Sequence, residues 1–94
     1  MTERTEPDES LLPRVQPRFR LQWEQAQQSW VLLYPEGMVK LNQSAGEIMK
    51  RCDGVRSVQQ IIDELEHTFG VDDLGGDVRD FLQIATRQSW LEWV

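Results

Sequence analysis

Residues 30–52 decide the fold, and they read WVLLYPEGMVKLNQSAGEIMKRC. The run over residues 30–34 is apolar throughout, which is typical of a strand covered on both faces. Proline fixes φ and glycine accepts positive φ, so residues 35–37 predict a tight turn into another short strand over residues 38–41. Beyond residue 42 the spacing of apolar residues changes from two to about 3.6, which predicts a helix.

A strand is also predicted before this stretch, because residues 19–24 alternate strictly between apolar and polar. Its apolar face carries Phe19, Leu21 and Trp23. Three strands with short connections predict an antiparallel meander. For the helix that follows, Asn42 is the expected N-cap and Gly54 the expected stop.

Two more helices are predicted after residue 56. Ser57 and Gln60 form a capping box at the start of the first, and Gly70 lies just past its end. The last helix is expected to begin near Asp72 or Asp73, where carboxylates complement the helix dipole. Its apolar positions cover an arc of about 180°, wider than one core needs. They are Leu74, Val78, Phe81, Leu82, Ile84, Ala85 and Leu91. Two explanations stay open, a helix wedged between sheet and helices and a helix whose flank faces a partner.

The order of elements predicts an α+β fold, with a three-stranded antiparallel sheet followed by three helices, like a winged helix-turn-helix. The 94 residues are enough for one small core. Residues 1–18 hold three of the four prolines and few large apolar groups, so we expect a mobile N-terminal tail. Residues 19–94 then form the single domain.

Composition excludes several classes of protein. Sixteen acidic residues against ten Lys and Arg give a formal net charge of −6, which opposes binding to nucleic acid. A single cysteine and a single histidine exclude an internal disulfide and the usual zinc spacings. No apolar leader or long apolar run is present, so we expect a cytoplasmic protein without a membrane partner.

No arrangement of residues indicates catalysis. Cys52 falls on the apolar stripe of the first helix, which favours a buried, unreactive thiol. His67 follows Glu64 at i+3, but a di-metal site requires a second copy of this motif. We therefore predict no enzyme activity, no catalytic residue, no metal site and no cofactor.

The last strand of a meander is an edge with unpaired N–H and C=O groups. A peptide that added a strand along residues 38–42 and placed side chains on the last helix would be held by β-augmentation. The alternative is that Lys40 and the tail only protect this edge from other chains.

The run over residues 33–48, LYPEGMVKLNQSAGEI, resembles the PqqD family of pyrroloquinoline quinone (PQQ) biosynthesis. The resemblance continues through the RCDG of residues 51–54, the FGVDD of residues 69–73 and the WL of residues 90–91. It covers residues 17–93.

The resemblance implies a non-catalytic peptide chaperone that binds the precursor peptide PqqA and presents it to the radical S-adenosylmethionine enzyme PqqE. It implies a RiPP recognition element, a domain that binds a leader peptide as an added strand between the third strand and the third helix. Carried onto this chain, the strand contributes the backbone of Met38, Val39, Lys40, Leu41 and Asn42. The helix contributes the apolar side chains of Val78, Phe81, Leu82 and Ala85. A winged-helix DNA-binding domain or a general protein-interaction module is the alternative function, and we expect a monomer, with a dimer as the alternative.

Overall fold

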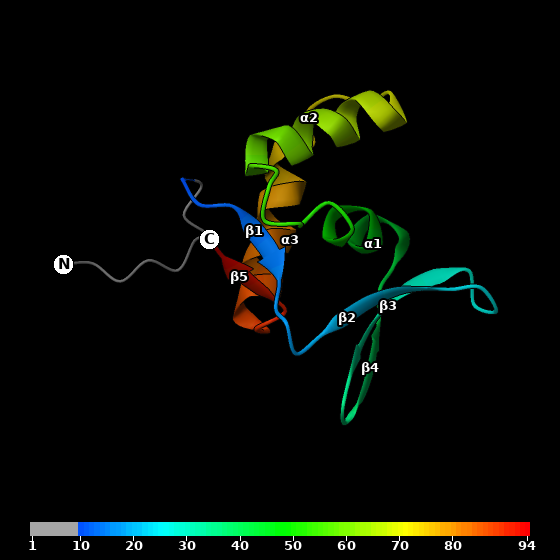
Figure 1. Ribbon diagram of the computed structural model, residues 1–94. Helices are drawn as coiled ribbons and strands as arrows, with labels where there is room; N and C mark the ends of the chain where they lie inside the picture. Colours follow the sequence, from blue (N-terminus) through cyan, green and yellow to red (C-terminus); the bar gives the residue numbers. More distant parts are fainter. Residues whose placement is uncertain (1–9) are drawn as a thin grey trace.

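The computed structural model describes residues 10–94, which form two small antiparallel sheets and three helices (Figure 1). The elements in chain order are β1 (Pro13–Val15), β2 (Arg20–Glu24), β3 (Ser29–Tyr34), β4 (Gly37–Lys40), α1 (Gln43–Met49), α2 (Val58–Phe69), α3 (Gly75–Arg87) and β5 (Leu91–Trp93). The predicted α+β class, with three antiparallel strands before three helices, is confirmed. The likeness to a winged helix stays a prediction.

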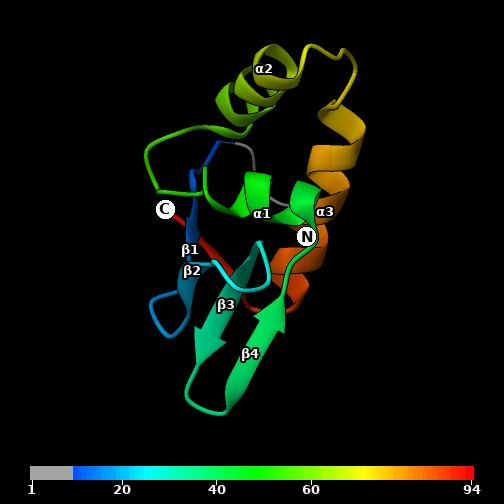
Figure 2. The same ribbon diagram turned by 90° about the vertical axis from the view of Figure 1, so that its right-hand side faces the viewer.

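The three predicted strands form a meander in the order β2-β3-β4, with β3 in the centre. A two-residue turn joins β3 to β4, since Tyr34 pairs with Gly37. Figure 2 shows the β3–β4 hairpin extending away from the helices. Because β4 is an outer strand of the meander, nothing within residues 10–94 pairs with its outer edge.

Helix α1 follows β4 almost at once and packs on β3. The Asn42 side chain accepts a hydrogen bond from the Ala45 N–H at 2.8 Å, so the predicted N-cap is confirmed. Gly46 is buried against Trp30, and a Cβ at this position would lie 2.5 Å from the indole. This close approach requires glycine and holds the start of α1 against the sheet.

The predicted stop of α1 at Gly54 is wrong, because the helix ends at Met49. The chain tightens there, with the Cys52 N–H bonded to the carbonyl of Met49 and the Arg51 N–H bonded to that of Ile48. These are three-residue steps that cannot continue an α-helix. Gly54 does adopt a positive φ of 78°, but in the loop that follows.

Helix α2 is as predicted, with a reciprocal capping box between Ser57 and Gln60 and a left-handed Gly70 at its end. Helix α3 was expected to begin near Asp72 or Asp73 and begins two residues after Asp73. Asp73 is left-handed, with φ 65°, which a helix does not allow, and α3 begins at Gly75.

The start of α3 is instead tied to α2. The Leu74 N–H donates to the Glu66 carboxylate at 3.0 Å, a contact between residues eight apart that no local capping rule predicts. Asp77 is the acidic residue that remains in the first helical turn, where it complements the helix dipole.

The C-terminal segment also differs from expectation, because Leu91 belongs to β5 and not to the last helix. Helix α3 ends with Ser89 in the left-handed region at φ 63°. The Trp90 N–H bonds to the Ala85 carbonyl, and the Ser89 N–H bonds to the Thr86 carbonyl, which is a Schellman ending. The left-handed position after a helix is usually glycine, so Ser89 gave no sequence signal that the helix ends here.

Strand β5 pairs with β1, so the prediction that residues 1–18 form a mobile tail is wrong from Pro13 onward; residues 1–9 lie outside the described residues. Leu12 and Val94 exchange two backbone hydrogen bonds of 2.7 and 2.9 Å. Pro13 is fully buried, and the side chains of Arg14 and Glu92 form an ion pair across the two strands. The two ends of the domain therefore stabilise each other.

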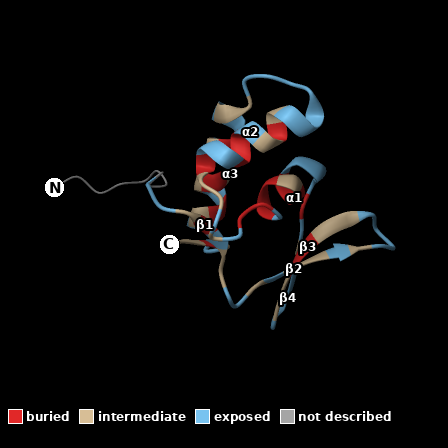
Figure 3. Cartoon of the chain, turned by 45° about the horizontal axis from the view of Figure 1, so that its top comes forward, coloured by how far each residue is buried: buried red, intermediate tan, exposed pale blue. Residues whose placement is uncertain are grey.

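The core lies between the helices and the inner face of the meander, and buried residues concentrate on the inner sides of α1, α2 and α3 (Figure 3). Its fully or nearly fully buried side chains include Leu32, Met49, Val58, Ile61, Val78, Leu82 and Ala85. Most of the meander is only partly covered, which leaves β4 accessible.

Candidate functional site

The open edge of β4 is the first part of the candidate site. The Leu41 N–H donates to the Trp30 carbonyl at 2.9 Å, so the backbone of Leu41 faces β3. Antiparallel pairing alternates, and therefore Val39, opposite Leu32, also directs its N–H and C=O toward β3. The corresponding groups of Met38 and Lys40 point to the open edge. Among the predicted edge residues, Met38 and Lys40 thus offer unused hydrogen-bonding groups, whereas Val39 and Leu41 use theirs in the sheet.

The side chains of residues 38–41 also alternate, between the core and the surface. Val39 packs toward the core, and Leu41 is buried within it. Met38 is 47% exposed and Lys40 is exposed on the opposite face of the strand. Asn42 is exposed at the junction of β4 and α1.

The predicted residues of α3 do not share one surface. Leu82 and Ala85 have no exposed area and belong to the core, so their side chains are not available to a peptide in this structure. Val78 is also buried, although it borders a cleft, and Phe81 is half-buried. Ile84, one turn after Phe81, is 48% exposed and lies on the outer side of the helix.

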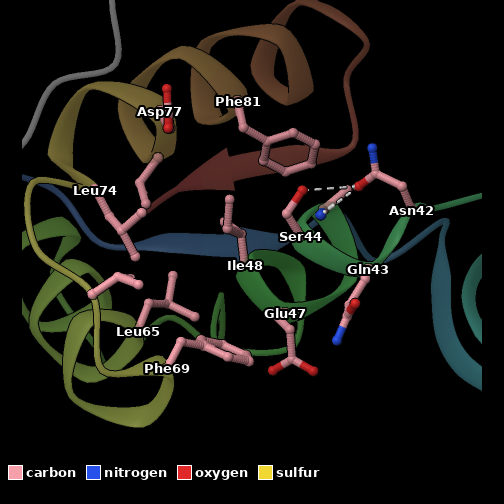
Figure 4. Close-up of a pocket in the computed structure, with 13 residues that line it drawn as sticks. Asn42, Gln43, Ser44, Glu47, Ile48, Leu65, Phe69, Leu74, Asp77 and Phe81 are labelled. Carbon is pink, nitrogen blue, oxygen red and sulfur yellow. Dashed lines mark hydrogen bonds between the residues drawn. The ribbon is translucent and has the colours of Figure 1, made fainter.

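A cleft of about 730 Å³ lies where α1, the end of α2 and the start of α3 meet. Figure 4 shows Ile48, Leu65, Leu74 and Phe81 converging on this space from the surrounding elements. The ring of Phe81 points toward Ser44 and the Asn42 end of α1 (Figure 4). The complete lining consists of Asn42, Gln43, Ser44, Ala45, Glu47, Ile48, Leu65, Phe69, Val71, Leu74, Asp77, Val78 and Phe81. The cleft therefore begins where β4 ends.

Of the nine predicted site residues, Asn42, Val78 and Phe81 line the cleft. The other walls of the cleft come from elements distant in sequence and were not predicted. One signal was available: Phe69 continues the apolar stripe of α2 into its last residue, and Val71 adds another apolar group just past the helix-ending Gly70. Both are substantially exposed.

An ion-pair network fixes α1 relative to α2 beside this cleft. Arg51, of which 8% is exposed, donates to Glu47 at 2.9 Å and to Glu64 at 3.2 Å. Arg56 donates to Glu64 at 2.6 Å and to Asp53 at 2.7 Å. Hydrogen bonding from Arg56 lowers the pKa of Glu64, with Arg51 contributing to the same shift. Asp53 also has a lowered pKa, mainly because it accepts the backbone N–H of Arg56.

Cys52 and His67, the one cysteine and the one histidine of the chain, both lie outside the lining of the cleft. Burial raises the pKa of the Cys52 thiol to about 12, so the thiol stays protonated and unreactive at neutral pH, in agreement with the prediction. His67 is exposed on α2, away from the cleft lining. Within residues 10–94, no group of three or more His, Cys, Asp or Glu side chains is placed to hold a metal ion. None of the described helices combines the length and apolar composition needed to cross a membrane.

Comparison with known proteins gives consistent results. The family model described as Coenzyme PQQ synthesis protein D (PqqD) matches residues 29–91. A protein of Pseudomonas fluorescens named PqqA binding protein is 51% identical over 86 residues, covering 90% of this chain and 94% of the relative. A protein of the same name from Methylococcus capsulatus is 41% identical and covers 85% of this chain and 86% of the relative.

A solved structure is also similar, with a TM-score of 0.77, 29% sequence identity, and coverage of 94% of this chain and 96% of the other. It is the solution NMR structure of the PqqD truncation of Methylobacterium extorquens PqqCD, described as a functional, stand-alone RiPP recognition element. The fold and the open strand edge thus place this chain in the class of small α+β domains to which that recognition element belongs. Within this class, the chain belongs to the PqqD family.

Proposed function

We propose that this chain is a peptide chaperone of PQQ biosynthesis that binds the precursor peptide PqqA as a strand added to β4 and presents it to PqqE. The observation that carries the proposal is the outer edge of β4. Met38 and Lys40 direct their backbone groups away from β3, and no described element covers them. An added strand satisfies these groups, and backbone hydrogen bonds then supply affinity that depends little on peptide sequence.

The relatives support the choice of peptide, because two of them are named for binding PqqA. Family membership supports the role in PQQ biosynthesis. The buried, protonated thiol of Cys52 supports a binding protein in place of an enzyme, because it is not available as a nucleophile.

The chaperone acts by proximity. A free precursor samples many conformations, and binding to β4 tethers it as one strand while the rest of the peptide stays available to the enzyme. A monomer suffices for this mechanism, since the edge and the cleft lie in one chain.

DNA binding is less well supported. Arg14, Arg51 and Arg56 are all paired with carboxylates, so these cations do not form a free basic surface.

The test measures the rate at which PqqE crosslinks PqqA, with and without the chain, at precursor concentrations below saturation. We expect the chain to raise the rate, and a folded chain carrying an altered β4 edge to raise it less. Equal rates in the presence and absence of the wild-type chain contradict the presentation role. A parallel binding measurement with PqqA alone separates failure to bind from failure to present.

A further inference from the structure

The cleft between α1, α2 and α3 has the features of a second recognition site next to the edge of β4. Phe69 and Val71 border the cleft and are 45% and 43% exposed. Phe69 is the last residue of α2, and Val71 follows the C-cap Gly70. Exposed apolar groups are ordinary when scattered, but these two adjoin the buried apolar walls provided by Ile48 and Leu65. A large apolar side chain placed here removes both exposed groups from water.

The cleft is continuous with the edge of β4. Asn42 lines it and lies two residues beyond Lys40, the last strand residue that directs its backbone outward. In extended conformation two residues span about 7 Å. A peptide strand paired with Lys40 that continues in the direction of α1 therefore reaches the cleft within a few residues.

Charge indicates the kind of side chain that accompanies the apolar group. The charged residues lining the cleft are Glu47 and Asp77, and no Lys or Arg is among its described lining residues. Glu47 is already paired with Arg51, while Asp77 is exposed on the first turn of α3. The rim thus favours a cation and disfavours a second carboxylate.

We infer that this cleft binds a segment of the precursor peptide just outside the added strand, taking one large apolar side chain that has a Lys or Arg beside it. The inference rests on the proposed function and adds a sequence-specific contact to it. The edge of β4 recognises any extended backbone, whereas the cleft selects among peptides.

The experiment measures the affinity of full-length chain variants for synthetic PqqA by calorimetry. Val71→Ala removes two methyl groups from the rim of the cleft, and Phe69→Ala removes its ring. Val55→Ala is the matched control, because Val55 is a 75% exposed valine outside the cleft lining. We expect affinity to fall about fivefold for Val71→Ala and about tenfold or more for Phe69→Ala, with no change for Val55→Ala.

A second pair of variants tests the charge. Asp77→Asn is expected to weaken binding about two- to fivefold at low salt and less at high salt, whereas Asp80→Asn, at an exposed position on α3 that does not line the cleft, has no effect. Circular dichroism confirms that each variant is folded.

Precursor variants identify the occupant. In PqqA, single apolar residues adjacent to Lys or Arg are replaced by alanine. The PqqA replacement at the residue that occupies the cleft lowers the affinity for the wild-type chain but not for the Phe69→Ala chain. Wild-type affinity in both Phe69→Ala and Val71→Ala overturns the cleft as a site but leaves the β4 proposal intact. Failure of the wild-type chain to bind PqqA overturns both.

Discussion

Replacing Lys40 by proline tests the direction of the backbone groups on β4. The Lys40 N–H points to the open edge, so the proline ring lies outside the β3–β4 pairing and the sheet keeps its hydrogen bonds. A bound strand, in contrast, loses one N–H donor and meets the ring where that donor was. The matched control is Lys40→Ala, which removes the same side-chain charge and keeps the N–H.

The size of each effect follows from the contacts. Both variants lose the exposed charge of Lys40, which weakens the free energy of PqqA binding by about 0–1 kcal/mol. Loss of the hydrogen bond costs about 0.5–1.5 kcal/mol more, and displacement of the strand by the ring adds to this, so Lys40→Pro weakens PqqA binding about 10- to 100-fold relative to Lys40→Ala. Val39→Pro differs, because it removes an N–H that faces β3 and costs the fold that hydrogen bond, about 0.5–1.5 kcal/mol, in addition to backbone strain.

The assay combines calorimetric titration with PqqA and urea unfolding of each variant. We expect Lys40→Pro to unfold within about 1 kcal/mol of Lys40→Ala while binding far more weakly. If the folded Lys40→Pro variant binds PqqA as tightly as Lys40→Ala, the peptide does not pair with this edge and the reasoning is refuted.

Three further predictions concern the fold that carries the site. Gly46→Ala, whose new Cβ meets an indole at 2.5 Å, lowers the free energy of unfolding by about 1–3 kcal/mol, whereas Gly76→Ala, which meets nothing within 4 Å, leaves it equal or raises it by up to about 1 kcal/mol; urea unfolding of both checks this. Deleting residues 1–16 removes β1 and its backbone hydrogen bonds, so it lowers the unfolding temperature well below that of a deletion ending before Ser10, and equal temperatures for the two contradict the pairing of β1 with β5. The pKa of Glu64 is below its ordinary value of 4.5 in the folded state, so its contribution to stability is present above about pH 4.5 and is lost as pH falls through the folded pKa; Glu64→Gln makes acid unfolding less steep, and an unchanged pH profile contradicts the network.

Local signals were sufficient for most of the elements. The meander follows from alternation, an apolar run and one turn, and the caps at Asn42, Ser57 and Gly70 each satisfy backbone groups within three or four residues. Such signals require no knowledge of the rest of the chain, which is why they were correctly predicted.

The errors occur where distant residues decide the structure. β1 exists because Pro13 and Leu12 meet the C-terminal strand, and a three-residue strand has no hydrophobic pattern of its own. The start of α3 depends on Glu66 from α2. The end of α3 depends on Ser89 in the left-handed conformation, which serine rarely adopts, so the sequence did not indicate this end.

The candidate site shows the same division. The open edge of β4 follows from the order of the strands and was predicted. The predicted flank of α3 combines buried and accessible positions, because a wide apolar arc does not reveal that Leu82 and Ala85 face the core while Ile84 faces outward. The cleft needed three helices in place before its walls met.

The most direct test of the central claim is an NMR titration of the isotope-labelled chain with PqqA, followed by amide hydrogen exchange of the complex. We predict saturable shifts along β4 and the cleft, with exchange slowed at the N–H groups of Met38 and Lys40, which face the open edge in the free chain. An unrelated peptide of similar charge serves as the control. Saturable binding that leaves the exchange of both amides unchanged would contradict an added strand on β4.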